Sequence, residues 1–368
     1  MTLAYSPEHE DLRSAVRKLF VEQADSEQLR CTLESDAPFD RDLWGTMAQE
    51  LGLHGMALPE EYGGSGFGFL EQAVVLEEMG RAVHTSPYLA SVVLAATLIR
   101  LSGNGEACAA YLPGIASGDL VATAAVLDTN GLWAGVQTGL ALDSFGRVSG
   151  VAPFVIDGAA ADLFLAVAND GSEPVLVAVK TAQDGAQATD HPTLDQTRGL
   201  ATVTLTSAEA TVVARGEAVA VAVAETEFHV LAALSAEMVG AAGKVLEATV
   251  DYAKIREQFG VPIGSFQAIK FKAADMLLDL EAARSASLYA SRAVAEEAED
   301  RGFAAEAAKA VCSDALFAIA AESVQIFGGI GFTWEHDAHL FFKRAKSSEL
   351  LLGNGDVHRE RLATRQGW

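Results

Sequence analysis

A segment in the last third of the chain combines an arginine, two glycines and the start of a helical pattern. It reads Arg256-Glu257-Gln258-Phe259-Gly260-Val261-Pro262-Ile263-Gly264-Ser265-Phe266-Gln267. The arginine ends one helical pattern, glycine and proline predict a turn, and Ser265 stands where it can cap the next helix. A guanidinium beside the free amides of a helix start is a good receptor for a pyrophosphate. A helix connector with an ordinary surface arginine is the alternative.

Glycines also gather at the end of a later helical pattern, in Gln325-Ile326-Phe327-Gly328-Gly329-Ile330-Gly331. Because glycine has no Cβ, a ligand can approach the backbone closely there. A lone Gly-Gly-x-Gly is weak evidence for a ligand site. A third segment, Ala345-Lys346-Ser347-Ser348-Glu349-Leu350-Leu351-Leu352-Gly353-Asn354-Gly355, follows it.

These three segments, in this order, resemble the C-terminal helical domain of the acyl-CoA dehydrogenases. The loop Pro59-Glu60-Glu61-Tyr62-Gly63-Gly64-Ser65-Gly66 resembles one in the N-terminal domain of that family. Its glycines could cradle a phosphate, but a tight connector between helices is the favoured interpretation. The resemblance covers nearly the whole chain, is weak in its central part and is specific in its last third. It implies an acyl-CoA substrate, FAD as cofactor and α,β-dehydrogenation of the thioester.

The resemblance also assigns cofactor contacts, position by position. The FAD pyrophosphate, largely that of a neighbouring subunit, is implied at Arg256, Gln258, Phe259, Phe266 and Gln267. The adenosine end of FAD is implied at Gln325, Ile326, Phe327, Gly328 and Gly329. An electron-transfer flavoprotein or a similar acceptor is the implied redox partner.

The catalytic base of the family has no counterpart at its usual positions. Its Glu belongs to an aromatic-Glu-Gly step, which corresponds here to Leu351-Leu352-Gly353, and some members carry it instead at the position of Val230. Neither Leu352 nor Val230 can take a proton from the substrate. Three acids lie one helical turn from these positions, and each is more simply a solvated charge or a salt-bridge partner: Glu349, Asp356 and Glu227.

The central part of the chain repeats this deficit. Full flavin sites of the family carry a Thr-Glu-x-x-x-Gly-Ser-Asp loop and a Trp-x-(Thr/Ser) step, which the stretches 126–134 and 153–157 do not match. The elements that reach across a dimer are therefore kept, while the chain's own flavin loop and base are lost.

This pattern of loss resembles the base-lacking subunits of heteromeric actinobacterial acyl-CoA dehydrogenases. We therefore expect a partner subunit that completes the FAD site of a related chain. Two alternatives stay open. The first is a self-sufficient homodimer or homotetramer with an unrecognised base. The second is a non-catalytic scaffold that binds acyl-CoA.

Periodicity predicts the elements that position these residues. Residues 1–118 form successive amphipathic helices, the first capped by Ser6, and 119–216 form a β domain with strands at 120–126, 163–167, 175–179, 201–205 and 211–213. Residues 217–368 form a four-helix bundle, with helical patterns at 218–255, 265–299, 303–327 and 337–365. The fold class is mainly α with a central β domain, as the resemblance also implies.

The composition of the chain limits its possible binding partners and cellular location. The formal net charge of -24 excludes nucleic acid and an anionic membrane surface as obvious partners. The three cysteines and eight histidines show no metal-ligand spacing. The longest apolar stretches, such as 228–243, are interrupted by His229 and Glu237 and are too short to span a bilayer, so no membrane insertion is predicted. We expect a cytoplasmic protein.

Overall fold

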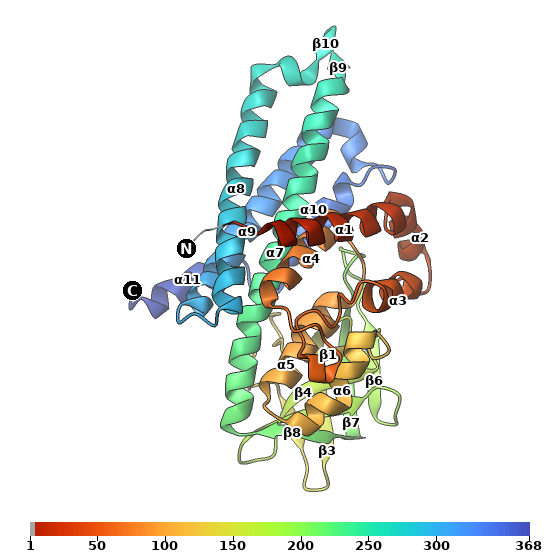
Figure 1. Cartoon of the computed structure of the whole chain (residues 1–368), viewed down its shortest axis with the longest axis vertical. Helices are drawn as coiled ribbons and strands as arrows, with labels where there is room; N and C mark the ends of the chain where they lie inside the picture. Colours follow the sequence, from red (N-terminus) through yellow and green to blue (C-terminus); the bar gives the residue numbers. More distant parts are fainter. Residues whose placement is uncertain (1–3) are drawn as a thin grey trace. The chain divides into compact units, whose positions relative to one another are not determined.

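The computed structural model describes residues 4–368 (Figure 1). The chain divides into two compact units. The first, called here the helical unit, consists of the residues up to Leu29, Ala73–His84 and Leu231–Trp368. The second, called the sheet unit, consists of Arg30–Gln72 and Thr85–Val230. A mainly α chain with a central sheet is thereby confirmed.

Long helices build the helical unit. Figure 1 shows α7 and α8 running side by side and joined at one end by the short β9–β10 hairpin. The bounds are α1 (Pro7–Gln23), α4 (Phe69–Arg81), α7 (Glu217–Ile255), β9 (Glu257–Gln258), β10 (Val261–Pro262), η3 (Ile263–Ser265), α8 (Gln267–Ala295), α9 (Arg301–Phe327), η4 (Gly328–Phe332), α10 (Ala338–Leu350) and α11 (Gly355–Arg365). Ser6 caps α1 as predicted, because its hydroxyl accepts from the amide of His9.

The last helical pattern was predicted to run unbroken from 337 to 365, and this is wrong. It consists of two helices, because Leu352 (φ 66°) and Gly353 (φ 104°) adopt left-handed backbone conformations that end α10. The side chain of Asn354 then accepts a hydrogen bond from the amide of Val357 at 3.1 Å and starts α11.

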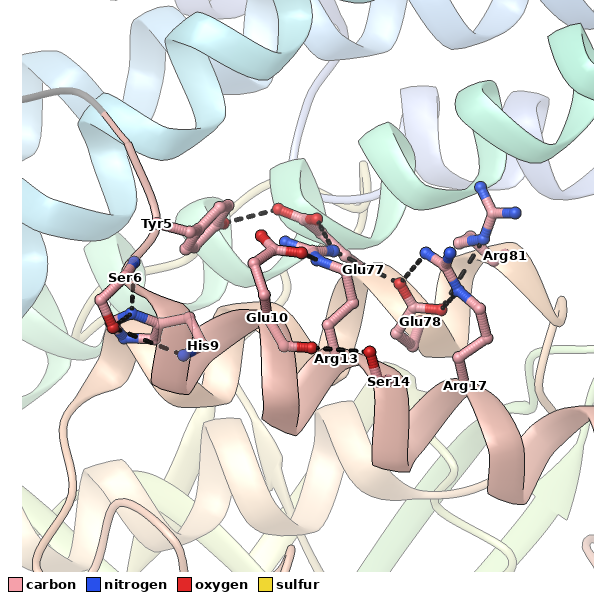
Figure 2. Close-up of polar contacts among 10 residues, drawn as sticks. All are labelled: Tyr5, Ser6, His9, Glu10, Arg13, Ser14, Arg17, Glu77, Glu78 and Arg81. Atoms are coloured by element: carbon pink, nitrogen blue, oxygen red, sulfur yellow. Dashed lines mark hydrogen bonds and ion pairs between the residues drawn. The ribbon is translucent and has the colours of Figure 1, made fainter.

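Helices α4 and α7 cross with their backbones in contact. A Cβ added to Gly80 would lie 1.9 Å from the carbonyl oxygen of Glu237, and one added to Gly240 would lie 1.7 Å from that of Glu77. Only glycine fits at these two positions. Charged side chains of α1 and α4 meet in one network (Figure 2), and Arg81 of α4 also pairs with Glu247 of α7.

The sheet unit contains the eight-stranded sheet, in the order β6-β7-β3-β2-β4-β5-β8, with β1 paired parallel to β4. Alternating and continuous runs of Val, Leu and Ala build its core. All five predicted strands are present, and β2, β3 and β6 join them. The strands are β1 (Ala122–Ala125), β2 (Leu140–Leu142), β3 (Arg147–Ile156), β4 (Leu163–Asn169), β5 (Pro174–Lys180), β6 (Ala186–Asp190), β7 (Leu200–Glu209) and β8 (Thr211–Arg215).

Shorter helices complete the chain before the sheet. They are α2 (Ser26–Glu34), α3 (Arg41–Gln49), η1 (Glu60–Tyr62), the π-helical η2 (Leu89–Ala95), α5 (Ala96–Leu101) and α6 (Gly105–Ser117). The glycine-rich loop predicted as a helix connector contains η1, which ends at Gly63 (φ 81°).

Two helices are long and apolar enough to cross a membrane by length and composition, which corrects the expectation that no apolar stretch is long enough. They are Glu217–Ile255 and the stretch Arg301–Phe332. Within the protein, 61% and 50% of their apolar windows are buried. Core helices of a bundle pass the same test, so this is weak evidence for a membrane span.

Candidate functional site

The hairpin that joins α7 to α8 carries the first group of predicted cofactor residues. Gln258 pairs with Val261, and Phe259 (φ 55°) and Gly260 (φ 79°) form the two-residue turn between them. Left-handed conformation at both turn residues is the hairpin type that favours glycine, so Phe259 is strained there. Its ring is 94% exposed and meets that of Phe266 edge to face, with centroids 6.2 Å apart. Both predicted aromatic residues therefore lie together on the surface.

Arg256 is exposed at the base of the same hairpin. Its main chain is fixed, because its carbonyl accepts from the amide of Ile263 at 2.7 Å. Within residues 4–368 its side chain makes no hydrogen bond or ion pair. The guanidinium is thus available to a ligand or to another chain.

The predicted cap of α8 is wrong. The hydroxyl of Ser265 donates to the carbonyl of Pro262 at 2.7 Å, inside the turn η3, and the N-cap residue is Phe266, which makes no side-chain cap. The first amides of α8, beginning with Gln267, therefore keep the free hydrogen-bonding capacity of an uncapped helix start. This leaves an anion-receptive helix end beside Arg256.

The second group of predicted residues lies where α9 ends. Gln325 is exposed, whereas Ile326 and Phe327 are buried. The ring of Phe327 packs on that of Tyr252 (centroids 4.8 Å apart), one turn before Arg256. The structure therefore brings the two groups together, although Phe327 itself serves the core.

Gly328 and Gly329 differ in backbone conformation. Gly328 has φ 65°, which by itself explains a glycine. Gly329 has no positive φ, and a Cβ at either position would meet nothing within 4 Å. Packing within the described residues therefore does not require glycine at 329.

A cavity of about 430 Å³ lies between these two groups. Ile326 is the one predicted cofactor residue that lines it. The lining residues come from α7, the hairpin, α8 and α9: Thr249, Val250, Ala253, Lys254, Pro262, Gly264, Ile269, Lys270, Ala273 and Ile326.

The turn after α10 carries the position where the family has its base. Leu352 is 1% exposed and strained at φ 66°. Its turn is held by Lys309 of α9, which is fully buried and donates to the carbonyls of Glu349 (3.0 Å) and Gly353 (2.7 Å) and to the hydroxyl of Ser313 (3.1 Å). All three ammonium protons have acceptors. Sequence reasoning missed Lys309, because nothing in an alanine-rich helix marks it as buried.

His358 of α11 lies near this turn and is also fully buried. Burial, followed by the positive charges of Lys309 and Arg361, lowers the pKa of its imidazole to about 3. The carbonyls of Leu352 and Gly353 oppose the shift, although neither ring nitrogen is in hydrogen-bonding geometry with a described residue. The imidazole is therefore neutral at physiological pH.

Two of the three acids weighed as replacement bases, Glu349 and Asp356, form ordinary ion pairs within their own helices. Glu349 accepts from Lys346 at 2.8 Å and Asp356 from Arg359 at 2.9 Å, each one turn away on its own helix. Glu227 lies buried in the sheet unit, as does Val230, so its interpretation as a solvated charge is wrong. Ion pairing one turn along a helix agrees with the simpler interpretation of Glu349 and Asp356.

The loop that stands in place of the family's flavin loop is shaped by its own polar groups. Leu127 and Trp133 form an antiparallel bridge. Within it the carboxylate of Asp128 accepts from the amides of Asn130 (2.7 Å) and Leu132 (2.9 Å). The one carboxylate of this loop thus stabilises a turn. Among residues 4–368, no three His, Cys, Asp or Glu side chains are grouped to hold a metal ion.

Comparison with known proteins supplies the family. Residues 6–119 match the model of the acyl-CoA dehydrogenase N-terminal domain, and residues 221–367 match that of the C-terminal domain. Acyl-CoA dehydrogenase IpdE2 of Mycolicibacterium smegmatis is 34% identical over 348 residues, 95% of each chain. Among solved structures, a chain of the ChsE4–ChsE5 complex of Mycobacterium tuberculosis is 29% identical (TM-score 0.90, 100% and 99% covered). A chain of the Tcur3481–Tcur3483 steroid ACAD is 30% identical (TM-score 0.87, 97% of each covered). The chain therefore belongs to the acyl-CoA dehydrogenases, a family of FAD-dependent oxidoreductases.

Proposed function

We propose that this chain is a partner subunit in the α,β-dehydrogenation of an acyl-CoA thioester, without a catalytic base of its own. The observation that carries the proposal is the turn at Leu352. The turn is left-handed and is anchored by Lys309, and the side chain at its centre is a buried leucine. An aliphatic side chain cannot remove the α-proton. A related chain has to supply the base.

The same chain offers one half of an FAD site. FAD, when bound, accepts the hydride from the substrate's β-carbon. Arg256 and the uncapped start of α8 at Gln267 fit its pyrophosphate, since both present unused donors. Gln325 and the open surface of Gly329 fit its adenosine end. Gln258, Phe259 and Phe266 would complete the contact at the exposed hairpin.

Two relatives support a two-chain assembly. The ChsE4–ChsE5 and Tcur3481–Tcur3483 structures are each named as a pair of chains. In a mixed dimer, the related chain would supply the flavin loop and the glutamate, while this chain supplies the cross-subunit contacts. An electron-transfer flavoprotein or a similar acceptor would then reoxidise the flavin.

The decisive experiment is co-expression with a related chain that carries the glutamate, followed by native mass measurement and flavin quantification. We expect a complex that contains both chains, with about one FAD per heterodimer. A homotetramer with one tightly bound FAD per chain would contradict the proposal. It would mean that the sheet unit binds flavin through residues other than those of the family's loop.

Activity of the chain alone is a second test. It should reduce flavin with acyl-CoA very slowly or not at all, because a positioned base contributes about 10²–10⁴-fold. Vigorous turnover by a homo-oligomer would favour the self-sufficient alternative. The variants Glu349→Gln, Asp356→Asn and Glu227→Gln would then identify the overlooked acid.

The cofactor assignment has its own test in the natural assembly. Arg256→Ala should lower flavin affinity by about 1.5–3 kcal/mol, the value of a hydrogen bond to a charged group. Lys18→Ala is the control, since Lys18 is an exposed cation on α1 that, within residues 4–368, pairs only with Glu22, at 4.0 Å, and does not line this cavity. Equal flavin content in both variants and the parent chain would show that the arginine assignment is wrong.

A further inference from the structure

A second cavity, of about 300 Å³, lies within the helical unit. Helices α1, α4 and α7 and the starts of α2 and α10 line it, and none of the residues assigned above to FAD or to the base position takes part. Its volume is at the lower end of the range for small-molecule sites. Nothing in the proposed subunit function uses this cavity.

One part of the lining is apolar. Phe20 of α1 and Leu340 of α10 are almost fully buried, and Val21, which is 68% exposed, stands at the surface beside them. The remaining apolar lining residues are Ala24, Leu29, Ala82, Val83 and Phe341. This surface favours a ligand with a compact apolar body.

The other part contains two guanidiniums that are held rigidly by carboxylates. Figure 2 shows the carboxylate of Glu78 between the side chains of Arg17 and Arg81. Arg17 donates to Glu78 through two nitrogens, at 2.8 and 2.7 Å, and Arg81 donates to Glu247 through two, at 3.0 and 2.6 Å. Bidentate pairing fixes both guanidinium planes at the cavity wall.

Lys244 is the lining cation left over from this pairing. It is exposed on α7, and within residues 4–368 it makes no hydrogen bond or ion pair. Its charge acts on Glu247 only at longer range, after Arg81, which is the main cause of the lowered pKa of that carboxyl. The lining carries three cations (Arg17, Arg81 and Lys244) and three carboxylates (Asp25, Glu78 and Asp337), so its formal charge is zero in a chain of net charge -24.

The acids that line the cavity are engaged elsewhere. Asp25 accepts from the amides of Glu27 (2.9 Å) and Gln28 (3.1 Å) at the start of α2. Asp337 accepts from the hydroxyl of Ser26 at 2.7 Å. Neither is paired with Lys244, so the ammonium is available to an anion from outside.

We propose that this cavity is a binding site for a small organic anion, namely a carboxylate on a medium-length apolar chain. The carboxylate pairs with Lys244 beside the Arg17 and Arg81 guanidiniums, and the chain lies against Phe20 and Leu340. Such a ligand matches both parts of the lining, whereas a neutral lipid would leave the cation unused and an inorganic anion would leave the apolar part empty.

Titration calorimetry on the full chain in its natural assembly tests this, with octanoate as the probe. We expect saturable binding of octanoate, with octylammonium and 1-octanol at least about tenfold weaker, since a charge-assisted contact of this size is worth about one decade. Lys244→Gln should weaken octanoate by about tenfold, and Val21→Trp should weaken it by crowding the cavity. Both positions are exposed, so the fold is retained, as circular dichroism will verify.

Lys254→Gln is the matched control, because Lys254 is another exposed α7 lysine and is distant from this lining. The proposal is wrong if octanoate binds no more tightly than 1-octanol. It is also wrong if the affinity for octanoate is the same in Lys244→Gln, Val21→Trp and the parent chain. The latter would place octanoate in another site, such as that of the acyl chain of the substrate. The measured quantity is octanoate binding and not flavin content or turnover, so failure of this proposal can be told apart from failure of the proposed function.

Discussion

Replacing Lys309 with methionine tests how the turn at Leu352 is held. The substitution keeps a long unbranched side chain and removes three hydrogen bonds, of which two go to the main-chain carbonyls of Glu349 and Gly353. Each carbonyl left without a donor costs about 1–3 kcal/mol. Removing a buried ammonium recovers part of this, because its desolvation no longer opposes folding. We expect a net loss of about 2–4 kcal/mol in the free energy of unfolding.

Urea unfolding followed by circular dichroism measures this loss on the purified chain. Lys254→Met is the control, since that ammonium is 67% exposed and its pairing with Asp251 is worth less than about 1 kcal/mol. A second measurement is local. The Lys309 charge helps to lower the pKa of His358, so NMR titration of the imidazole in Lys309→Met should show a raised pKa.

Two results would refute this reasoning. If Lys309→Met unfolds at the same urea concentration as the parent chain, the carbonyls of the turn have other donors and Lys309 is not its anchor. If stability falls but the pKa of His358 stays unchanged, the loss comes from packing in α9, and the ammonium does not lie where the turn needs it.

Three further predictions follow from buried groups of the helical unit. His358 stays neutral in the folded chain but is protonated below about pH 6.5 when unfolded. The free energy of unfolding should therefore fall as the pH drops from about 6.5 towards 3. Urea unfolding at several pH values should show that His358→Phe flattens this dependence. Glu78→Gln should lower the free energy of unfolding by about 3–5 kcal/mol, because the carboxylate is 1% exposed and pairs with Arg17. Glu247→Gln is the control, since that side chain is 53% exposed, and it should lower this free energy by less than about 1 kcal/mol. Gly240→Ala should destabilise the fold by about 3 kcal/mol or more in thermal unfolding, because the added Cβ would overlap the carbonyl of Glu77. Gly243→Ala is the control, since the nearest atom to its Cβ would lie at 3.4 Å.

Much of the fold could be predicted from the sequence because it depends on local pattern. Helical periodicity placed α7 and α9 within a few residues of their observed bounds, and runs of Val and Leu marked five of the strands. The absence of a carboxylate at Leu352 and Val230 is likewise a matter of residue type, which no folding can change.

Local capping was less predictable. Ser6 caps α1 as its position suggests, whereas Ser265 bonds inside the preceding turn and leaves α8 uncapped. Both serines stand before a helical pattern, and only the path of the incoming chain decides which acceptor or donor each can reach. For the same reason the break between α10 and α11 escaped the periodicity.

The sequence by itself determined the family pattern, the helical and strand content and the absence of a carboxylate at Leu352 and Val230. The tertiary structure decided which charges are buried and what they hold. Lys309 resembles any helix lysine in the sequence, but packing against the end of α10 turns it into the anchor of the Leu352 turn. Arg17 and Glu78 likewise meet only because α1 lies along α4. Such contacts join residues far apart in the chain, and burial raises their energy by excluding water, so no local pattern can reveal them.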